Sequence, residues 1–202
     1  PRMRKKIWIV IGLVLLCSFL ILATIIRIKM GKIPSEKDLL AINQQTASEI
    51  YSSDGQILGR IFAENRTNVS FNEIPKNFLD ALIATEDARF FEHSGIDYRS
   101  LGRVLIKSIL LQDQSAGGGS TLSQQLAKNL YPRKKGGVLD LVGAKFREAL
   151  TANKLESIYT KEELLTLYLN TVSFGEDVYG IEAASIRYFN KKPIDLEVQE
   201  SS

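Results

Sequence analysis

The chain has 202 residues, enough for one domain with a hydrophobic core but too few for a second full enzyme domain. Its formal net charge is +3, but four of the 26 Lys and Arg residues form a basic head at positions 2–6, and the other 22 face 23 Asp and Glu, which argues against general nucleic-acid binding. The single cysteine, Cys17, and the single histidine, His93, argue against a disulfide framework, a cysteine metal site and a Ser-His-Asp or Cys-His nucleophile.

An uncharged apolar run covers residues 7–26 and is as long as a helix must be to cross about 30 Å of hydrocarbon. It leads directly into Arg27 and Lys29 without a small-residue cleavage site, so we expect an uncleaved anchor. The basic head favours a cytoplasmic N-terminus, which places the rest of the chain outside the membrane. The predicted divisions are a cytoplasmic tail (1–6), a transmembrane helix (7–26), a stalk (27–48) and a domain (49–202).

The predicted domain begins with short β-prone runs and continues as helices. Asp54-Gly55 suits a tight turn, which predicts a small β-hairpin within residues 49–71. Pro75 fits the first position of a helix that runs to Asp87. The spacing of apolar residues predicts further helices over residues 98–112, 121–131, 139–157 and 161–170. Thr160 and Glu163 stand in capping-box spacing at the start of the last of these.

The helix expected at 98–112 is basic and amphipathic, because apolar residues alternate with Arg99, Arg103 and Lys107. It can be an ordinary surface helix or a helix that lies on a membrane surface. An anchor that already holds the domain near lipid favours the second reading, and the pattern leaves both open.

Glu86 is the first residue whose position suggests chemistry. It follows Leu82 and Ile83 at helical spacing, so its carboxylate should lie beside an apolar face and be partly buried. Burial disfavours the charged form of a carboxylate and can make it a useful general base. The alternative is a buried acid that only accepts hydrogen bonds from backbone amides.

A second acidic candidate lies on the helix expected at 139–157. Lys145 and Glu148 interrupt an apolar stripe formed by Leu141, Ala152 and Leu155. They can be a local ion pair of small stabilising value or a charged pair that faces a cleft. The pattern alone leaves these readings equal.

Three glycines at 117–119 break the chain before polar residues that include Gln124 and Lys128, which lie four apart on one helix face. A cationic cluster follows at 133–135. A glycine-rich turn at a helix start, with cations nearby, can hold phosphate oxygens. The P-loop pattern is absent, and residues 133–135 by themselves are typical of a solvated charge run.

Taken together, these segments resemble the peptidoglycan glycosyltransferase domain (glycosyltransferase family 51) of class A penicillin-binding proteins and monofunctional transglycosylases. The resemblance runs from about Glu49 to the C-terminus. It is carried by EDARFFEHSG at 86–95, GGSTLSQQLAKN at 118–129, LYLNTVSFG at 167–175 and YGIEAA at 179–184.

The third motif of the family, Arg-Lys, two residues, then Glu, is present only in part. Lys145 and Glu148 fit, but Ala144 stands where the Arg would be. Arg147 or the cluster at 133–135 are the candidates for the missing charge.

The resemblance implies a mainly α, lysozyme-like fold with a membrane-associated lobe, and a domain truncated at its C-terminus. It implies an enzyme that polymerises lipid II into β-1,4-linked glycan with inversion and with release of polyprenyl pyrophosphate. No cofactor is required, although a divalent cation, Mg²⁺ or Mn²⁺, is left open. The implied partners are lipid II, the growing lipid-linked strand, membrane lipid and, as an open case, other cell-wall synthesis proteins.

The resemblance also implies the residues that act. Glu86 would be the general base that deprotonates the acceptor hydroxyl, and Glu148 would be the second catalytic acid. The residues implied to bind substrate are Asp87, Phe90, His93, Ser120, Thr121, Gln124, Gln125, Lys128, Arg133 and Lys145.

Two other functions fit parts of the sequence. A lysozyme-like hydrolase would use Glu86 as the acid and Glu148 to assist water, but it does not explain the motif at 118–129 or the lipid-facing features. An inactive membrane-tethered scaffold would bind cell-wall precursor without turnover, and the presence of Glu86 and of residues 120–128 weighs against it.

Overall fold

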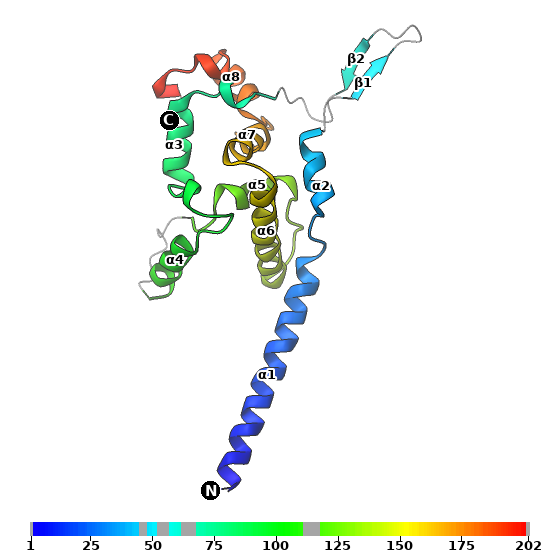
Figure 1. The fold of residues 1–202 in the computed structure, drawn as a ribbon, viewed down its shortest axis with the longest axis vertical. Helices are drawn as coiled ribbons and strands as arrows, with labels where there is room; N and C mark the ends of the chain where they lie inside the picture. Colours follow the sequence, from blue (N-terminus) through cyan, green and yellow to red (C-terminus); the bar gives the residue numbers. More distant parts are fainter. Residues whose placement is uncertain (1, 45–47, 52–56, 62–67, 111–117, 201–202) are drawn as a thin grey trace.

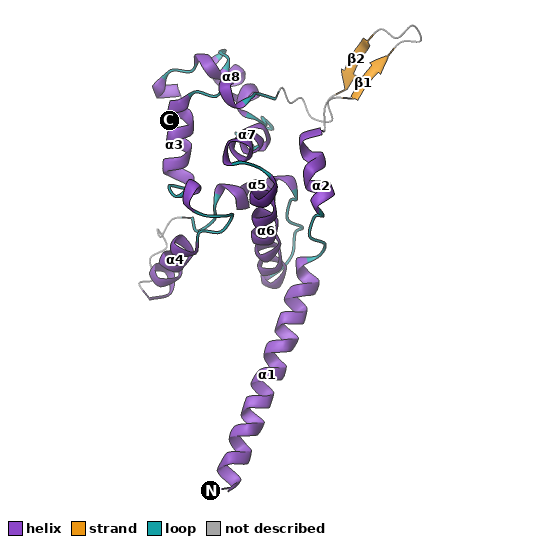
Figure 2. Cartoon of the chain, viewed as in Figure 1, coloured by secondary structure: helices purple, strands orange, loops and turns teal. Residues whose placement is uncertain are grey.

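A computed structural model describes residues 2–44, 48–51, 57–61, 68–110 and 118–200 of the chain. The described part is mainly helical, as expected, and a long first helix extends away from a cluster of shorter ones (Figure 1). Figure 2 shows that the strands are confined to one small ribbon. The α-helices are α1 (Arg2–Met30), α2 (Glu36–Leu40), α3 (Lys76–Glu86), α4 (Tyr98–Leu110), α5 (Leu122–Leu130), α6 (Val138–Ile158), α7 (Lys161–Thr171) and α8 (Ile181–Phe189).

Short 3-10 turns connect several of these helices. They are Ala41–Gln44, Phe71–Glu73, Phe90–Glu92, Pro193–Asp195 and Val198–Glu200. Strands β1 (Ser48–Tyr51) and β2 (Ile57–Ile61) pair antiparallel, with Ser48 opposite Ile61. The expected turn at Asp54-Gly55 lies between these strands and outside the described residues.

The first helix contains the predicted membrane segment. The most apolar part of the stretch Lys6–Met30 in α1 has a mean hydropathy of 3.1, and it is not buried against the rest of the protein. By length and composition it can therefore cross a membrane, which is consistent with a membrane anchor.

The end of α1 packs on α6. Gly143 of α6 meets the backbone of α1 so closely that a Cβ atom there would lie 2.6 Å from the carbonyl carbon of Lys29 and 2.7 Å from the amide nitrogen of Met30. The Lys29 ammonium and the Asp140 carboxylate form an ion pair 2.9 Å long beside this contact. The C-terminal end of α1 is therefore fixed to α6.

The segment after α1, expected to be a stalk, is also packed on the domain. Leu39 of α2 is fully buried in the core, and the Tyr159 hydroxyl donates a hydrogen bond of 2.7 Å to its carbonyl oxygen. The Lys154 ammonium donates to the carbonyl oxygen of Pro34. The described part of this segment is thus held on the domain, because Leu39 belongs to the core and α2 contacts α6.

Replacing Gly143 with Ala is expected to lower the melting temperature of the purified protein, because backbone atoms of α1 would have to move. Overpacking of this kind costs about 1–3 kcal/mol. The matched control is Gly102→Ala on α4, where an added Cβ meets nothing within 4 Å and where Ala is better than Gly in a helix by up to about 1 kcal/mol. Equal melting temperatures for the two variants would show that α1 does not pack on α6.

The core lies where α5, α6 and α7 meet, and capping boxes fix the start of two of these helices. The Thr160 hydroxyl accepts the Glu163 amide at the start of α7, as predicted, and the Thr121 hydroxyl accepts the Gln124 amide at the start of α5. The apolar face of each helix then points inward, and its most buried members are Leu122, Leu126, Leu155, Leu164, Leu165 and Leu169. The motif at 118–129 thus contacts the motif at 86–95 through Asp87 and the partial third motif on α6 through Lys145.

Candidate functional site

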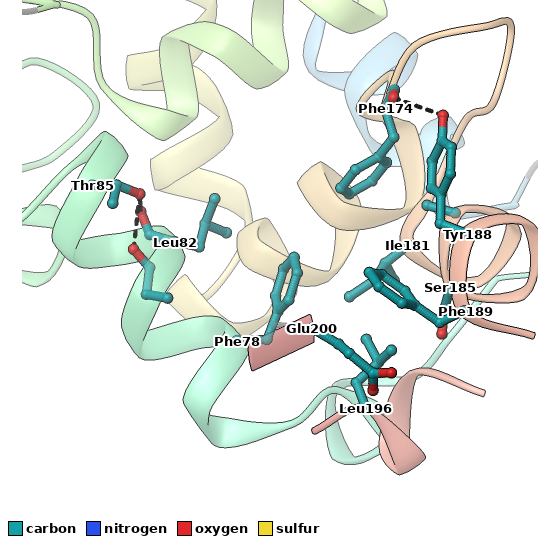
Figure 3. A pocket seen from close by; sticks show the side chains of 12 residues that line it. Phe78, Leu82, Thr85, Phe174, Ile181, Ser185, Tyr188, Phe189, Leu196 and Glu200 are labelled. Carbon is teal, nitrogen blue, oxygen red and sulfur yellow. Dashed lines mark hydrogen bonds between the residues drawn. The ribbon is translucent and has the colours of Figure 1, made fainter. Parts of the chain in front are cut away.

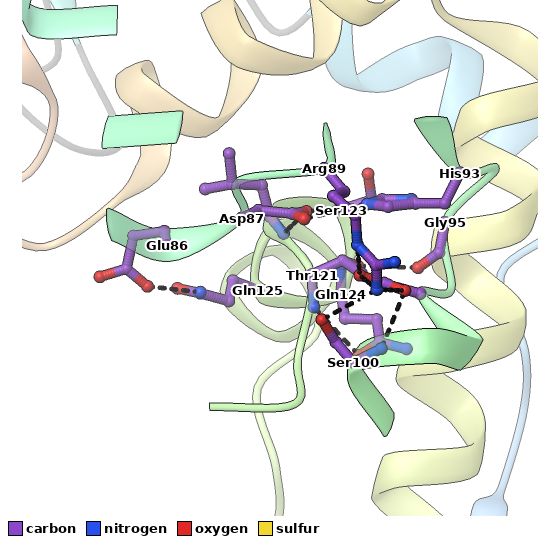
Figure 4. Close-up of polar contacts among 12 residues, drawn as sticks. Glu86, Asp87, Arg89, His93, Gly95, Ser100, Thr121, Ser123, Gln124 and Gln125 are labelled. Atoms are coloured by element: carbon purple, nitrogen blue, oxygen red, sulfur yellow. Dashed lines mark hydrogen bonds and ion pairs between the residues drawn. The ribbon is translucent and has the colours of Figure 1, made fainter. Parts of the chain in front are cut away.

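Glu86 is the last residue of α3, and its carboxylate points toward α5 (Figure 4). The Gln125 side-chain amide donates a hydrogen bond of 2.8 Å to Glu86 Oε2. Glu86 is exposed, so the expectation of partial burial is wrong. The helix ends here, and Leu82 and Ile83 are themselves only half-buried, so no neighbouring turn covers the carboxylate.

Tyr168 of α7 completes this polar chain. It is buried, and its hydroxyl lies 3.2 Å from Gln125 Oε1, to which it donates a hydrogen bond. Burial, and then the charge on Glu86, raises the pKa of Tyr168 to about 12, so the phenol stays protonated at neutral pH. Gln125 is therefore held between one donor and one acceptor.

Asp87 joins the first motif to the second. Its carboxylate accepts the backbone amide of Leu122 at 3.0 Å and contacts His93 Nε2 at 3.0 Å. The Thr121 hydroxyl donates to the carbonyl oxygen of Gly95 at 2.7 Å. These contacts fix the end of α3, and with it Glu86, against the start of α5.

Several residues expected to bind substrate thus lie inside the protein. Asp87, Phe90 and Thr121 are buried, and the side chain of His93 is 8% exposed. Asp87 and Thr121 use their polar groups on other parts of the chain, whereas His93 Nδ1 has no hydrogen-bond partner among the described residues. The Lys161 ammonium lies over the Phe90 ring, 4.2 Å from its centroid. In this structure these residues build the joint between the motifs.

A second joint in the first motif was not predicted. The Arg89 guanidinium binds both carboxylate oxygens of Asp97, with Nε at 3.1 Å and Nη2 at 2.6 Å from Oδ2. Asp97 also accepts the backbone amides of Arg99 and Ser100 at the start of α4. Although its burial acts in the opposite direction, the hydrogen bonds from Ser100 and Arg89 hold the pKa of Asp97 far below its usual range.

Asp97→Asn is expected to lower the melting temperature at neutral pH. The folded-state pKa of Asp97 is depressed, so its contribution is present above the unfolded pKa of about 3.9 and is lost as the pH falls toward the lowered value. The gap between the melting curves of variant and wild type should therefore narrow below about pH 4. Asp195→Asn, at an exposed carboxylate, is the control; a gap for Asp97→Asn that does not change with pH would contradict this assignment.

A cluster of cations surrounds Glu148 on α6. The Glu148 side chain is 2% exposed, and the Arg133 guanidinium binds both of its oxygens, with Nε at 2.6 Å and Nη2 at 2.9 Å. The Lys145 ammonium lies 3.5 Å from Glu148 and donates to the Ser120 hydroxyl at 2.9 Å. The hydrogen bond to Glu148 raises the pKa of Arg133. Two cations thus share one buried carboxylate, which leaves a net positive charge beside Ser120.

The structure decides which Arg lies beside Glu148. Ala144 is buried one turn before Glu148 on the same helix face. Arg147 points elsewhere and donates to the carbonyl oxygens of Tyr131 and Pro132. Arg133, from the loop between α5 and α6, is therefore the cation beside Glu148.

Gln124 and Lys128, two further residues expected to bind substrate, both lie on α5. Gln124 is used in the capping box of α5, where its side chain accepts the Thr121 amide at 3.3 Å. Lys128 is exposed, and within the described residues it makes no hydrogen bond or ion pair. The structure therefore leaves Lys128 able to reach a ligand, whereas Gln124 is committed to the fold.

A protein-bound metal ion does not fit the described residues. No group of three or more His, Cys, Asp or Glu side chains comes together among them. Both oxygens of Glu148, the acid nearest to the cation cluster, already accept hydrogen bonds from Arg133. The described residues therefore form no ready-made set of protein ligands for a metal ion.

An apolar pocket of about 360 Å³ lies elsewhere, between α3 and α8 (Figure 3). Phe78 and Leu82 of α3 line one side, and Ile181 and Phe189 of α8 line the other. Glu200, whose pKa is lowered by hydrogen bonds from Glu197 and Lys191, is its only acidic lining residue. Its composition suits apolar packing and offers no acid–base pair for catalysis.

Sequence reasoning missed Tyr168 and the pair of Arg89 and Asp97 as parts of the site. Tyr168 lies among Leu residues at helical spacing, which is also the pattern of an ordinary core residue. Arg89 and Asp97 lie on either side of a turn, where spacing carries no information about contact. The signal available for all three was their presence within or beside the motif segments.

Comparison with known proteins identifies a family and several relatives of this chain. A family model described as Transglycosylase matches residues 54–202. Penicillin-binding protein 1F of Bacillus subtilis (strain 168) is 41% identical over 200 residues, which are 98% of this chain and 27% of that protein. Penicillin-binding protein 1A of Aquifex aeolicus (strain VF5) is 34% identical over 99% of this chain and 27% of that protein. Penicillin-binding protein 1A of Neisseria flavescens is 35% identical over 90% of this chain and 22% of that protein. The chain therefore spans about a quarter of the length of these relatives.

Proposed function

Because this chain belongs to the transglycosylase family, we propose that it is a peptidoglycan glycosyltransferase that polymerises lipid II into β-1,4-linked glycan. The observation that carries the proposal is the exposed carboxylate of Glu86, held by Gln125 of α5, together with a cation cluster that contacts Ser120 just before the same helix. A proton acceptor and a site for an anion are the two elements that transfer from a pyrophosphate donor needs.

In the proposed reaction Glu86 accepts the proton of the acceptor's GlcNAc 4-hydroxyl as that oxygen attacks the anomeric carbon of the donor's MurNAc. The bond from the anomeric carbon to the pyrophosphate oxygen breaks, and polyprenyl pyrophosphate leaves with the electron pair. One displacement inverts the α-linked donor to a β-1,4 bond. Gln125 holds one oxygen of Glu86, which leaves the other free to take the proton.

The leaving pyrophosphate is proposed to bind beside Ser120. Lys145 donates to the Ser120 hydroxyl, and both Lys145 and Arg133 contact the buried carboxylate of Glu148. Both cations are therefore fixed in place before substrate arrives. Preorganised cations stabilise charge that develops in a transition state better than mobile ones do. Lys128 is the further cation that remains accessible on α5. Glu148 then acts as a positioning residue, because its oxygens are occupied by Arg133 and Lys145.

The setting proposed for this reaction is the outer face of a bacterial cytoplasmic membrane, with α1 as a single span and residues 49–202 as a lysozyme-like catalytic domain. The basic head at residues 2–6 supports a cytoplasmic N-terminus. The packing of α1 on α6 supports a catalytic domain held against the bilayer. Substrates with polyprenyl tails would then reach the site from the membrane.

The test is to incubate the purified protein in detergent or in vesicles with labelled lipid II and to separate the products by length. We expect lipid-linked glycan strands. Failure to form strands, when a known polymerase forms them from the same substrate, would overturn the proposal. Release of soluble disaccharide from finished glycan would instead establish a hydrolase, a role for which the paired and buried Glu148 is poorly suited.

A further inference from the structure

We propose that Tyr168 is a positioning residue that sets the orientation of the Gln125 amide and, through it, the position of Glu86. The inference rests on the proposed function for its kinetic consequences, but its geometric content stands on the contacts themselves. The chain of contacts runs from the Tyr168 hydroxyl to Gln125 Oε1, at 3.2 Å, and from Gln125 Nε2 to Glu86 Oε2, at 2.8 Å.

The carboxylate of Glu86 depends on Gln125 for its position. Glu86 is exposed at the end of α3, and among the described residues Gln125 is its one hydrogen-bond partner. Neither burial nor a second donor from the described part of the chain fixes the carboxylate. Its position before substrate binds is therefore set by the direction in which the Gln125 amide points.

The side-chain amide of Gln125 could in principle present either its oxygen or its NH₂ group to Glu86. Rotated by half a turn, the Gln125 side chain would place its oxygen against the Glu86 carboxylate, and two acceptors would face each other. The Tyr168 hydroxyl favours the observed orientation, because after rotation its oxygen could accept from the NH₂ group but its own proton would lose the acceptor that it has at Gln125 Oε1. Tyr168 is buried, and its pKa of about 12 keeps this proton on the phenol throughout the physiological pH range.

Tyr168 is itself held in place by the hydrophobic core. It lies within α7, whose neighbouring residues Leu167 and Leu169 belong to the hydrophobic core. A donor fixed by the core thus orients an amide at the surface, and the amide holds a carboxylate that the fold does not otherwise hold. Tyr168 does not touch the reacting atoms in this account and acts only through Gln125.

The direct test uses the side-chain amide signals of Gln125 in ¹⁵N NMR spectra of the full chain in detergent. Tyr168→Phe and Glu86→Gln are each expected to shift these signals, because each removes or changes one end of the chain of contacts. Tyr188→Phe is the matched control, since its hydroxyl donates to the carbonyl oxygen of Phe174 in another part of the protein. Unchanged Gln125 signals in a folded Tyr168→Phe variant would overturn the proposal whether or not the protein polymerises lipid II.

The kinetic test separates positioning from a general loss of structure. Tyr168→Phe is expected to lower kcat by up to about tenfold, the upper end of what one hydrogen bond between neutral groups contributes, with little change in KM. In a Gln125→Ala background the same substitution should have no further effect, because the residue through which Tyr168 acts is gone. Full additivity of the two substitutions would show that Tyr168 acts by another route. Normal kcat for Tyr168→Phe, with loss of activity for Glu86→Gln, would refute the positioning role and leave the proposed function intact.

Discussion

Replacing Glu86 with Gln is expected to lower the rate of lipid II polymerisation by about 10²- to 10⁴-fold, the range that a positioned general base contributes. The substituted side chain keeps the size of Glu and can still accept the hydrogen bond from Gln125, but it cannot take a proton. Because Glu86 is exposed, the substitution should leave the melting temperature unchanged. The measurement is the initial rate of strand formation from labelled lipid II.

The matched control is Glu92→Gln, an exposed carboxylate in the same motif. It is expected to polymerise at close to the wild-type rate. A Glu86→Gln variant that remains folded and polymerises as fast as this control would remove Glu86 from the mechanism.

Replacing Glu148 with Gln is expected to lower the polymerisation rate about 10²-fold, the effect of removing one preorganised stabiliser of transition-state charge. The loss arises because Arg133 and Lys145 would no longer share a fixed anion, so neither cation would be held for the leaving group. Breaking a buried ion pair should also reduce the free energy of unfolding by up to about 3 kcal/mol. Rate and melting temperature are measured on the same preparation.

The control is Glu162→Gln on α7, where the carboxylate is exposed and outside the cation cluster. A Glu148→Gln variant that melts at a lower temperature but polymerises at the wild-type rate per folded molecule would confine the cation cluster to a structural role. Arg133→Lys should fall between wild type and Glu148→Gln, because Lys keeps the charge but cannot bind both oxygens in the same way.

Helix spacing and capping predicted much of the fold. The capping box of Thr160 and Glu163 marks the start of α7, and the apolar spacing that follows predicts a helix that the structure contains. The same spacing suggested burial of Glu86, and this failed because a helical pattern does not show which turns other elements cover. α3 ends at Glu86, where the chain turns and leaves the carboxylate in the open.

Contacts between distant segments were beyond the reach of sequence spacing. Arg133 lies in a loop, and periodicity says nothing about the direction of a loop side chain; only the structure shows that it, and not Arg147, binds Glu148. Leu39 is one of a few apolar residues in a polar segment, so its burial in the core beside α6 could not be distinguished from exposure. Gly143 allows α1 to approach α6, a consequence that depends on which helix comes near.

The motif segments gave the site its chemistry, and the structure assigned different tasks within them. Asp87 and Thr121 join one motif to the next, whereas Glu86 and Lys145 remain accessible. Motif membership alone cannot separate a residue that builds the site from one that meets the substrate, because both are required at fixed positions.

The central claim is that this chain transfers a sugar from a lipid pyrophosphate donor with inversion, and product analysis tests it most directly. Wild-type protein is incubated with labelled lipid II, and the glycosidic bonds formed are compared with the polyprenyl pyrophosphate released. The account predicts one pyrophosphate for each new bond, and strands that a β-1,4-specific muramidase cuts to disaccharides. Pyrophosphate release without bond formation, or strands that resist the muramidase, would contradict it.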